Sequence, residues 1–423
     1  MRAARTTLTA AALAAVLTTL VAAGPASAAT PLAAPGTAAR PILSAEEAAP
    51  FTPHNYLDWS GPYVAPVADP WRPGPILPRR ADFVVGPAGG AGVTHTSVQS
   101  AVNAAFLAGG PARRYVKLLP GTYTGTVFIP AGSPPLTVYG AGAPEDVRIE
   151  FSLDSTATPA AWAAQVNPSG QYVEGDPAFA MYNSCATRTS ATIGLCATVM
   201  WSQAADLQLR GLTIVNTLLD TVDRGTHQAL ALRTDGDRTQ LELVRLISRQ
   251  DTFYANAGDN ARIARVLVRA SYVEGDTDFV FGRASAVFEF SRFHLVSTRK
   301  PSGGVIFSPN TAPAYPYGFL VRLCLITADD GYVAAPTGHF GRAWDQNAGS
   351  TGYLPGITPN GQLVIRDTYI GPGFDPVAPW SPAATTSRPF AARTDDGRDL
   401  NDVLFNRLWE FRTVGPGGAV GSP

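Results

Sequence analysis

Short β-prone segments recur along this chain at a regular interval, and this period constrains the fold more than any other feature. Neighbouring segments lie roughly 20 to 35 residues apart, which is the period range of solenoids, where each repeat forms one coil. The clearest segments are residues 207–216, 239–251, 262–275, 285–297, 318–328 and 361–371. The pattern predicts an all-β chain folded as a right-handed parallel β-helix. A β-sandwich is the alternative, but the Asn-Gly hairpin turns that it needs are mostly missing.

The composition agrees with a β-rich protein with many loops. The chain has 423 residues, 45% of them hydrophobic, which is enough for a large core. Glycine (41) and proline (36) are frequent, and charged residues make up 15%. The formal net charge is −1, which gives no electrostatic attraction to nucleic acid.

The N-terminus is typical of an exported protein. Arg2 and Arg5 precede an apolar run over residues 8–23, and Ala26-Ser27-Ala28 has the pattern of a cleavage site. We therefore expect a signal peptide over residues 1–28, cleaved after about Ala28, and a secreted, extracellular product. The apolar run is short and broken by threonines, so a transmembrane anchor is not expected.

The remaining chain divides into an arm and a large domain. Residues 29–80 are rich in proline and alanine and predict an extended N-terminal arm. Residues 81–423 form the predicted β-helix domain, and its segment 96–109 predicts a helix that caps one end of the stack. Residues 151–205 show no clear series of strands, so we interpret them as a long loop insertion over one face.

The chain has three cysteines, Cys185, Cys196 and Cys324. In an oxidising compartment Cys185 and Cys196 are close enough in sequence to close a short loop with a disulfide bond. Three unpaired, buried thiols are the alternative. Cys324 is expected to be a small buried hydrophobic residue.

Polar residues at the ends of predicted strands share the period of the coils. Gln228, the pair Gln250-Asp251, and Asp278 follow one another at steps of about one coil. In a parallel stack, residues one coil apart lie above one another, so we expect a polar column of amides and carboxylates. Asp278 interrupts the β-prone run 271–282, where an unpaired charge is costly. The nearby Glu274-Gly275-Asp276 is interpreted as turn chemistry.

Two neighbouring carboxylates suit acid–base and nucleophilic chemistry. Their pKa values move apart, so that one stays ionised and can attack while the other holds a proton and can donate it. The two glutamines offer N–H donors to a developing oxyanion. Arg342, two to three coils beyond Asp278, is a cation that could keep one aspartate ionised. Trp344 offers an aromatic wall suited to a sugar ring.

At this point the chain resembles a known family, the pectin methylesterases (pectinesterases), which are carbohydrate esterases built on a right-handed parallel β-helix. The resemblance covers roughly residues 83–418. The matching pieces occur in family order: GTYTGTV (121–127), QALAL (228–232), QDTFY (250–254), TDFVFG (277–282), GRAW (341–344) and LWEFRTVGPGG (408–418).

The resemblance implies a role for each matching residue. Asp278 resembles the nucleophile, Asp251 the general acid/base, and Arg342 the partner of the nucleophile. Gln228 and Gln250 resemble the oxyanion donors. The aromatic residues that resemble the lining of the substrate groove are Trp344, Phe281 and Tyr254.

The chain departs from the family pattern at three places. Gly125 stands where an acidic residue is usual, and Ala343 stands where proline is common. The insertion 151–205 resembles a bacterial branch, some of whose members are named as acyl-CoA thioester hydrolases. These departures concern the substrate groove and leave the polar column intact.

Three functions remain open from the sequence. The first is a secreted esterase that converts methyl-esterified polygalacturonate to pectate and methanol, acting as a monomer without metal or cofactor on a polysaccharide partner. The second is the same chemistry on another ester or thioester, and the third is a non-catalytic carbohydrate-binding β-helix. The intact acid pair argues against the third.

Other chemistries have weaker support. The chain contains no G-x-S-x-G motif, and its five histidines show no metal-ligand spacing. His227 and His294 are interpreted as structural. His339 faintly resembles the histidine of galacturonan-cutting glycosidases, but the rest of their pattern is missing.

Overall fold

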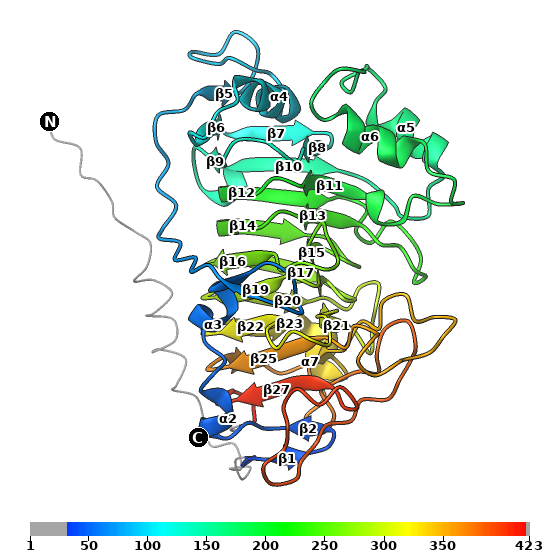
Figure 1. Ribbon diagram of the computed structural model, residues 1–423. Helices are drawn as coiled ribbons and strands as arrows, with labels where there is room; N and C mark the ends of the chain where they lie inside the picture. The colour runs from blue at the N-terminus through cyan, green and yellow to red at the C-terminus, as the bar shows by residue number, and fades with distance from the viewer. Residues whose placement is uncertain (1–31, 420–423) are drawn as a thin grey trace, which may run out of the picture.

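The computed structural model describes residues 32–419, which form a tall stack of parallel strands (Figure 1). The predicted signal peptide, residues 1–28, lies outside the described residues. A seven-stranded and a sixteen-stranded sheet build the stack. The chain passes from one face to the next and returns one coil further along, which is the architecture of a parallel β-helix.

The seven-stranded sheet forms one face of the stack. All of its strand pairs are parallel. Its strands, in spatial order, are β8 (Val127–Ile129), β11 (Thr198–Ser202), β13 (Leu230–Thr234), β15 (Phe253–Ala255), β18 (Val280–Gly282), β21 (Val305–Pro309) and β24 (His339–Gly341).

The sixteen-stranded sheet bends into the two other faces. Two long strands, β12 (Leu207–Asn216) and β14 (Thr239–Ile247), run through the bend and belong to both faces. The first face also contains β5 (Phe83–Val85), β6 (Arg114–Leu118), β9 (Leu136–Gly140), β16 (Arg265–Arg269), β19 (Ser285–Glu289), β22 (Phe319–Arg322), β25 (Gln362–Arg366) and β27 (Arg407–Phe411). The second contains β7 (Gly121–Thr124), β10 (Val147–Phe151), β17 (Tyr272–Gly275), β20 (Arg292–Leu295), β23 (Leu325–Ala328) and β26 (Tyr369–Ile370).

In seven successive coils, one residue makes this bend by adopting a left-handed backbone conformation. These residues are Gly211, Leu243, Ala270, Phe290, Leu323, Asp367 and Arg412, with φ between 46° and 62°. A left-handed residue turns the chain sharply, so most of the predicted long segments are two short strands instead of one. The segment 318–328, for example, is β22 followed by β23, with Leu323 between them.

The core fills the space between the three faces. Side chains from successive coils stack on one another in register, as do Leu241, Val268, Phe288 and Val321, which are fully buried. Each such side chain contributes on the order of 1.5–3 kcal/mol relative to exposure. The stack is therefore stabilised coil by coil, as in other solenoids.

Helix α4 (Val98–Ala108) lies at the upper end of the stack in Figure 1. Ser97 caps its N-terminus through a bond from the backbone N–H of Ser100, and Gly109 ends it with φ 56°. Its buried face includes Val98, Ala101, Val102 and Ala105, which join the main core. The other helices are short: α2 (Ala45–Ala48), α3 (Pro53–Leu57), α5 (Pro159–Val166), α6 (Phe179–Ala186), α7 (Asp330–Ala334) and the 3₁₀ turns Pro144–Asp146 and Gly194–Cys196.

The arm before residue 81 runs along the outside of the first face (Figure 1). Two small antiparallel pairs belong to it, β1 (Gly36–Thr37) with β2 (Arg40–Pro41), and β3 (Trp59–Ser60) with β4 (Val67–Ala68). Side chains of the arm, including Tyr56 and Leu57, pack against outward-facing residues of the sheet. These sheet residues are Leu267, Val287, Leu320, Val364 and Trp409.

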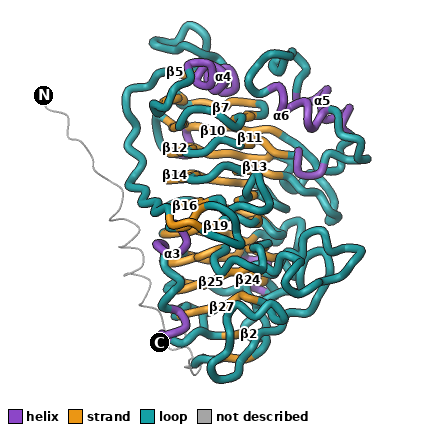
Figure 2. The backbone as a smooth tube through the Cα atoms, in the orientation of Figure 1, coloured by secondary structure: helices purple, strands orange, loops and turns teal. Residues whose placement is uncertain are grey.

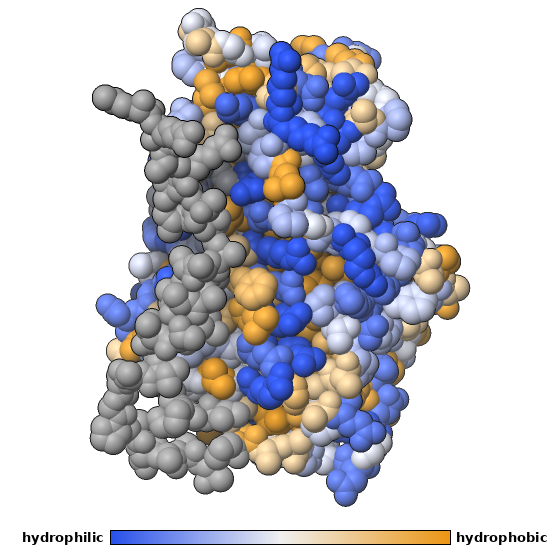
Figure 3. Space-filling model, turned by 90° about the vertical axis from the view of Figure 1, so that its left-hand side faces the viewer, coloured by the Kyte–Doolittle hydropathy of each residue, from blue (hydrophilic) through white to orange (hydrophobic). Residues whose placement is uncertain are grey.

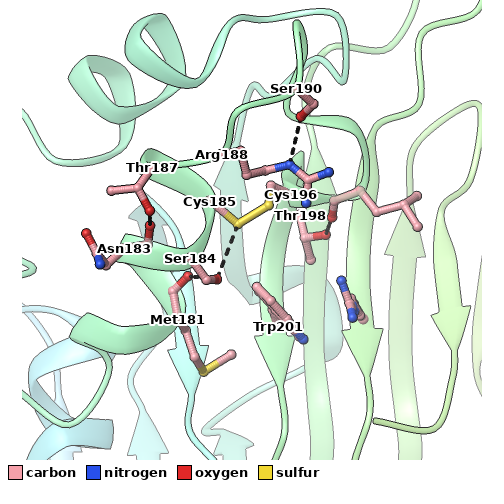
Figure 4. The surroundings of a disulfide bond; sticks show 12 residues. Met181, Asn183, Ser184, Cys185, Thr187, Arg188, Ser190, Cys196, Thr198 and Trp201 are labelled. Atoms are coloured by element: carbon pink, nitrogen blue, oxygen red, sulfur yellow. Dashed lines mark hydrogen bonds between the residues drawn. A yellow bond between two sulfur atoms is a disulfide. The ribbon is translucent and has the colours of Figure 1, made fainter. Parts of the chain in front are cut away.

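The segment between β10 and β11 forms helices α5 and α6 outside the stack of strands. Helices α5 and α6 have a cluster of buried side chains of their own, including Trp162, Tyr172 and Met181. Cys185 and Cys196 form a disulfide bond, which Figure 4 shows beside the strand that carries Trp201. The range 151–205 is too long for this insertion, because Thr198–Ser202 is strand β11 of the seven-stranded sheet.

Loops project mainly from one side of the strands, the side of α5 and α6 (Figure 2). On the face drawn in Figure 3, hydrophilic side chains run along the length of the molecule, with smaller apolar patches between them.

Within residues 32–419, none of the helices has the length and hydropathy needed to cross a membrane.

Candidate active site

The polar column predicted from sequence is present on the seven-stranded side of the stack. Isolated parallel bridges pair Gln228 with Gln250, and Gln250 with Thr277, on successive coils. The strands that follow keep the same register, since Phe253 pairs with Val280 and β15 lies beside β18. Asp251 and Asp278, each one residue after a bridge residue, therefore occupy equivalent positions on neighbouring coils.

The backbone presents both aspartates in the same unusual conformation. Asp251 has φ 67° and Asp278 has φ 48°, both in the left-handed region. Among residues other than glycine, aspartate is one of the few that adopt this region readily. Each aspartate thus turns the chain just before a strand, which explains how a carboxylate can interrupt a β-prone run.

Arg342 forms a bidentate ion pair with Asp278. Its Nε donates to Oδ1 at 2.8 Å and its Nη2 donates to Oδ2 at 2.6 Å. Burial of the arginine opposes its charge, but the attraction of Asp278 outweighs this, so the pKa of Arg342 is raised. A bidentate guanidinium–carboxylate pair of this kind fixes the orientation of the carboxylate.

The surroundings of Asp251 disfavour its ionised form. It is buried, and Gln228 donates from Nε2 to its Oδ2 at 2.7 Å. Burial first, and the negative charge of Asp278 second, raise the pKa of Asp251 well above its usual value. The site therefore pairs a carboxylate oriented by arginine with a carboxyl group whose raised pKa favours its protonated form, a combination that can supply a nucleophile and a general acid.

His227, which the sequence analysis interpreted as structural, contacts a residue of the polar column. Its backbone N–H donates to Oε1 of Gln250 at 3.0 Å, which fixes the orientation of that amide. Its ring contacts Asp154 at 2.8 Å and Asp223 at 3.1 Å, and although burial opposes it, these carboxylates raise the pKa of His227. Asp154 comes from the start of the insertion, 73 residues away, so no local pattern indicated this contact.

The insertion also supports Gln228 directly. The backbone N–H of Gln228 donates to the hydroxyl of Ser155 at 3.0 Å, and the N–H of Ser155 donates to the carbonyl of Gln228 at 2.9 Å. The insertion therefore contributes to the geometry of the site as well as covering a face.

Three predicted aromatic residues gather beside the column. Tyr254 and Phe281 stack with ring centroids 4.3 Å apart and an interplanar angle of 6°. Trp344 lies with its centroid 5.7 Å from Phe281 and 6.1 Å from Tyr254, and it remains partly exposed. Gly282 allows this packing, because a Cβ there would lie 2.0 Å from the carbonyl oxygen of Ala255.

The interpretation of Glu274-Gly275-Asp276 as turn chemistry is wrong. Glu274 lies in strand β17 and forms an ion pair with Arg249 at 2.7 Å. Asp276 is fully buried and pairs with Arg299, whose Nε lies 3.0 Å from its Oδ2. Burial raises the pKa of Asp276 despite this arginine, and Arg299 also donates from Nη1 to the carbonyl of Gly225 at 2.8 Å.

His294 and His339 lie away from the column. His294 is in β20 and its Nδ1 lies 2.8 Å from the hydroxyl of Thr327. His339 begins β24, and burial lowers its pKa. Within residues 32–419, His, Cys, Asp and Glu side chains form no group of three or more that could hold a metal ion.

Comparison with known proteins places this site in a family. The family model described as Pectinesterase matches residues 175–351. Pectinesterase B of Dickeya dadantii (strain 3937) is 56% identical over 387 residues, which are 89% of each chain. The chain belongs to the pectinesterase family. It is therefore a carboxylic ester hydrolase.

Two solved structures of relatives share the whole architecture. The Escherichia coli protein YbhC, named as a putative acyl-CoA thioester hydrolase, has a TM-score of 0.85 at 43% identity, covering 93% of this chain and 100% of its own. Rice weevil pectin methyl esterase has a TM-score of 0.82 at 36% identity, covering 91% of this chain and 100% of its own.

Proposed function

We propose that this pectinesterase is a secreted carbohydrate esterase that hydrolyses the methyl esters of polygalacturonate to pectate and methanol. The observation that carries the proposal is the contrast between the two aspartates of the column. Asp278 is held by Arg342 in a bidentate ion pair, while Asp251, in register with it, is buried with a raised pKa. This contrast supplies an attacking carboxylate and a proton donor side by side.

The first half of the proposed reaction forms an acyl-enzyme. A carboxylate oxygen of Asp278 attacks the ester carbonyl carbon, and the amide N–H groups of Gln228 and Gln250 stabilise the resulting oxyanion. The carbon–oxygen bond to the methoxy group then breaks. Asp251 transfers its proton to the departing oxygen, which leaves as methanol.

The second half restores the enzyme. Asp251, now a carboxylate, takes a proton from a water molecule as that water attacks the anhydride formed with Asp278. Cleavage of the anhydride releases the uronate carboxylate and returns Asp278 to its ion pair with Arg342. The aromatic residues Trp344, Phe281 and Tyr254 would contact the sugar rings, which suits a polysaccharide substrate.

Several finer features belong to the same proposal. We take the stack to wind to the right, as nearly all parallel crossover connections do, and α4 to cap its upper end. Residues 29–80 serve as the arm, residues 81–423 as the catalytic domain, and the protein acts as an exported monomer after loss of residues 1–28. Side chains supply every catalytic role, so no metal or organic cofactor is required.

A second substrate class has a specific observation in its favour. The relative YbhC, 44% identical over 399 residues, carries a name that refers to acyl-CoA thioesters. The names of the Dickeya dadantii and rice weevil relatives favour pectin instead. The same two-step chemistry would apply to either acyl group, so the choice depends on the substrate groove.

One assay separates the two substrates. Purified protein is given methyl-esterified pectin, with methanol release measured, and in parallel acyl-CoA, with thiol release measured. Methanol release that is well above the thioester rate supports the proposal. Thiol release without methanol would replace pectin by a thioester, and absence of both would leave the non-catalytic alternative.

A further inference from the structure

A column of charged side chains lies on the outer surface of the first face, beneath the N-terminal arm. Arg269, Glu289, Arg322 and Arg366 are the last residues of four successive strands, β16, β19, β22 and β25. They pair in register, each with the next. We call these four residues the arginine column.

The arginine column carries three positive charges and one negative charge, and Asp367, which pairs with Arg366 at 2.9 Å, offsets one of the three. Glu289 is shared, with Arg269 at 3.1 Å and Arg322 at 2.9 Å. Arg322 and Arg366 then follow each other on adjacent strands with no acidic side chain of the column between them. Strands of a sheet lie about 4.8 Å apart, and like charges directly opposite on neighbouring strands are destabilising. An anion between the two arginines would relieve this repulsion.

All four residues of the arginine column line a cavity. Its volume is about 550 Å³, and the arm closes it with Phe51, Leu57 and Trp71. Arg72 of the arm adds a further guanidinium, although Asp58 neutralises it. Ligand sites typically have volumes of about 300–1,000 Å³, so the cavity has room for one or two sugar rings.

Arg322, which faces Arg366 on the neighbouring strand, has N–H groups that donate to no acceptor among the described residues. Arg366 is largely used, because its Nη1 donates to the carbonyls of Ala48 and Phe51 and its Nε donates to Asp367. Arg322 uses Nη1 on Glu289, and within residues 32–419 its Nε and Nη2 donate to no protein acceptor. Its side chain is 30% exposed, so a ligand can reach these N–H groups. Guanidinium groups bind carboxylates with two parallel hydrogen bonds.

We propose that this cavity is a second saccharide-binding site, which takes the free carboxylate of a uronate on Arg322 and its sugar ring against Trp71. It is separate from the catalytic column, which lies on the seven-stranded side. The choice of a uronate rests on the proposed function, because a pectin methylesterase produces free uronate carboxylates as it works. The site would hold the enzyme on stretches of polymer that it has already de-esterified.

Hydrogen exchange with mass spectrometry tests this site by its location. The probes are trigalacturonate, neutral galactotriose and inorganic phosphate. The proteins are wild type, Arg322→Gln and, as a matched control, Arg148→Gln, which removes an arginine that is 36% exposed and has one acidic partner. Arg322→Gln should still release methanol at the wild-type rate, because Arg322 lies outside the catalytic column.

The expected result is protection of residues 51–57 and 71–74 by trigalacturonate in wild type and Arg148→Gln. In Arg322→Gln the concentration needed for this protection should rise at least tenfold. Protection confined to the loops around Gln228, Asp251 and Asp278 would overturn the second site and leave the proposed esterase intact. Equal protection by galactotriose or phosphate would overturn the uronate as its ligand.

Discussion

At the residue scale, the two aspartates of the polar column show how identical side chains acquire different chemistry. Both have a left-handed backbone and occupy equivalent positions on neighbouring coils. Asp278 receives two N–H donors from Arg342, whereas buried Asp251 has an amide donor and a nearby negative charge. The surroundings, and not the residue type, give Asp251 its raised pKa and give Asp278 its arginine partner.

The raised pKa of Asp251 predicts a change of stability with pH. Between the ordinary aspartate value of 3.8 and the raised pKa of Asp251, the folded protein binds more protons at this site than the unfolded chain. Stability should therefore fall as pH rises through this window. In Asp251→Asn this contribution is absent, so its Tm should fall less over the window than that of wild type. Its turnover should also drop, by about 10²–10⁴-fold, through loss of proton donation.

The measurement is Tm against pH for wild type, Asp251→Asn and a control, Asp396→Asn, which alters an exposed aspartate. The control should follow wild type. Curves of the same shape for wild type and Asp251→Asn would show that Asp251 does not titrate as described.

Loss of Arg342 should reduce stability as well as activity. Arg342→Ala leaves Asp278 largely buried without its cation, which should lower the free energy of unfolding by about 3 kcal/mol. This value is at the lower end of the range for buried pairs, because 23% of the arginine side chain is exposed. The double variant Arg342→Ala with Asp278→Asn removes the stranded charge and should recover most of that loss. Urea unfolding of both variants checks this, and a double variant no more stable than the single one would contradict it.

The residues that sequence predicted are those that share the period of the coils. Gln228, Gln250, Asp251 and Asp278 were found because the register of a parallel stack repeats. His227 and the Asp276–Arg299 pair were not predicted as such. Their contacts join side chains from different loops, and contacts of this kind do not repeat with the period of the coils.

At the element scale, the sequence predicts where strands lie better than where they bend. Ala270, Phe290 and Leu323 each adopt a left-handed conformation, yet none is glycine, so no turn residue marked the corner. The end of the insertion was misplaced for a related reason. Strand β11 is short and follows a helical excursion, so the local pattern of residues 198–202 did not stand out from it.

The disulfide should stabilise this excursion measurably. Cys185 and Cys196 close a loop with a sequence separation of 11 residues, which the chain-entropy model values at about 3 kcal/mol. Replacing both by serine should lower the Tm without abolishing the main stack, whose core is separate. Thiol titration of unreduced, denatured wild type should find one free thiol, that of Cys324, whereas three free thiols would contradict the bond.

At the scale of the whole molecule, the N-terminal arm is part of the folded structure. Its leucine and tyrosine side chains cover apolar residues on the outside of the first face. Arg265, fully buried in the sheet, pairs with Asp69 of the arm at 2.7 Å and with Asp237 at 2.6 Å. Composition predicted an extended arm, but the contact of Arg265 with Asp69 joins residues 196 positions apart and could not be predicted from it.

Burial of the arm predicts that its side chains matter for stability. Leu57→Ala should reduce the free energy of unfolding by about 2–5 kcal/mol, since Leu57 is 4% exposed. Leu77→Ala, at a leucine that is 72% exposed, is the control and should stay within about 0.5 kcal/mol of wild type. Equal, small effects in urea unfolding would mean that the arm is not packed as described.

The central claim is that Asp278 attacks the ester, and one variant tests it most directly. Asp278→Asn keeps the shape of the side chain but removes the attacking charge. Methanol release from methyl-esterified pectin and Tm should be measured side by side for wild type and variant. The account predicts a fall in turnover of at least about 10³-fold, with a Tm that falls because partly buried Arg342 loses its ion-pair partner. An Asp278→Asn protein with near wild-type turnover would contradict the mechanism.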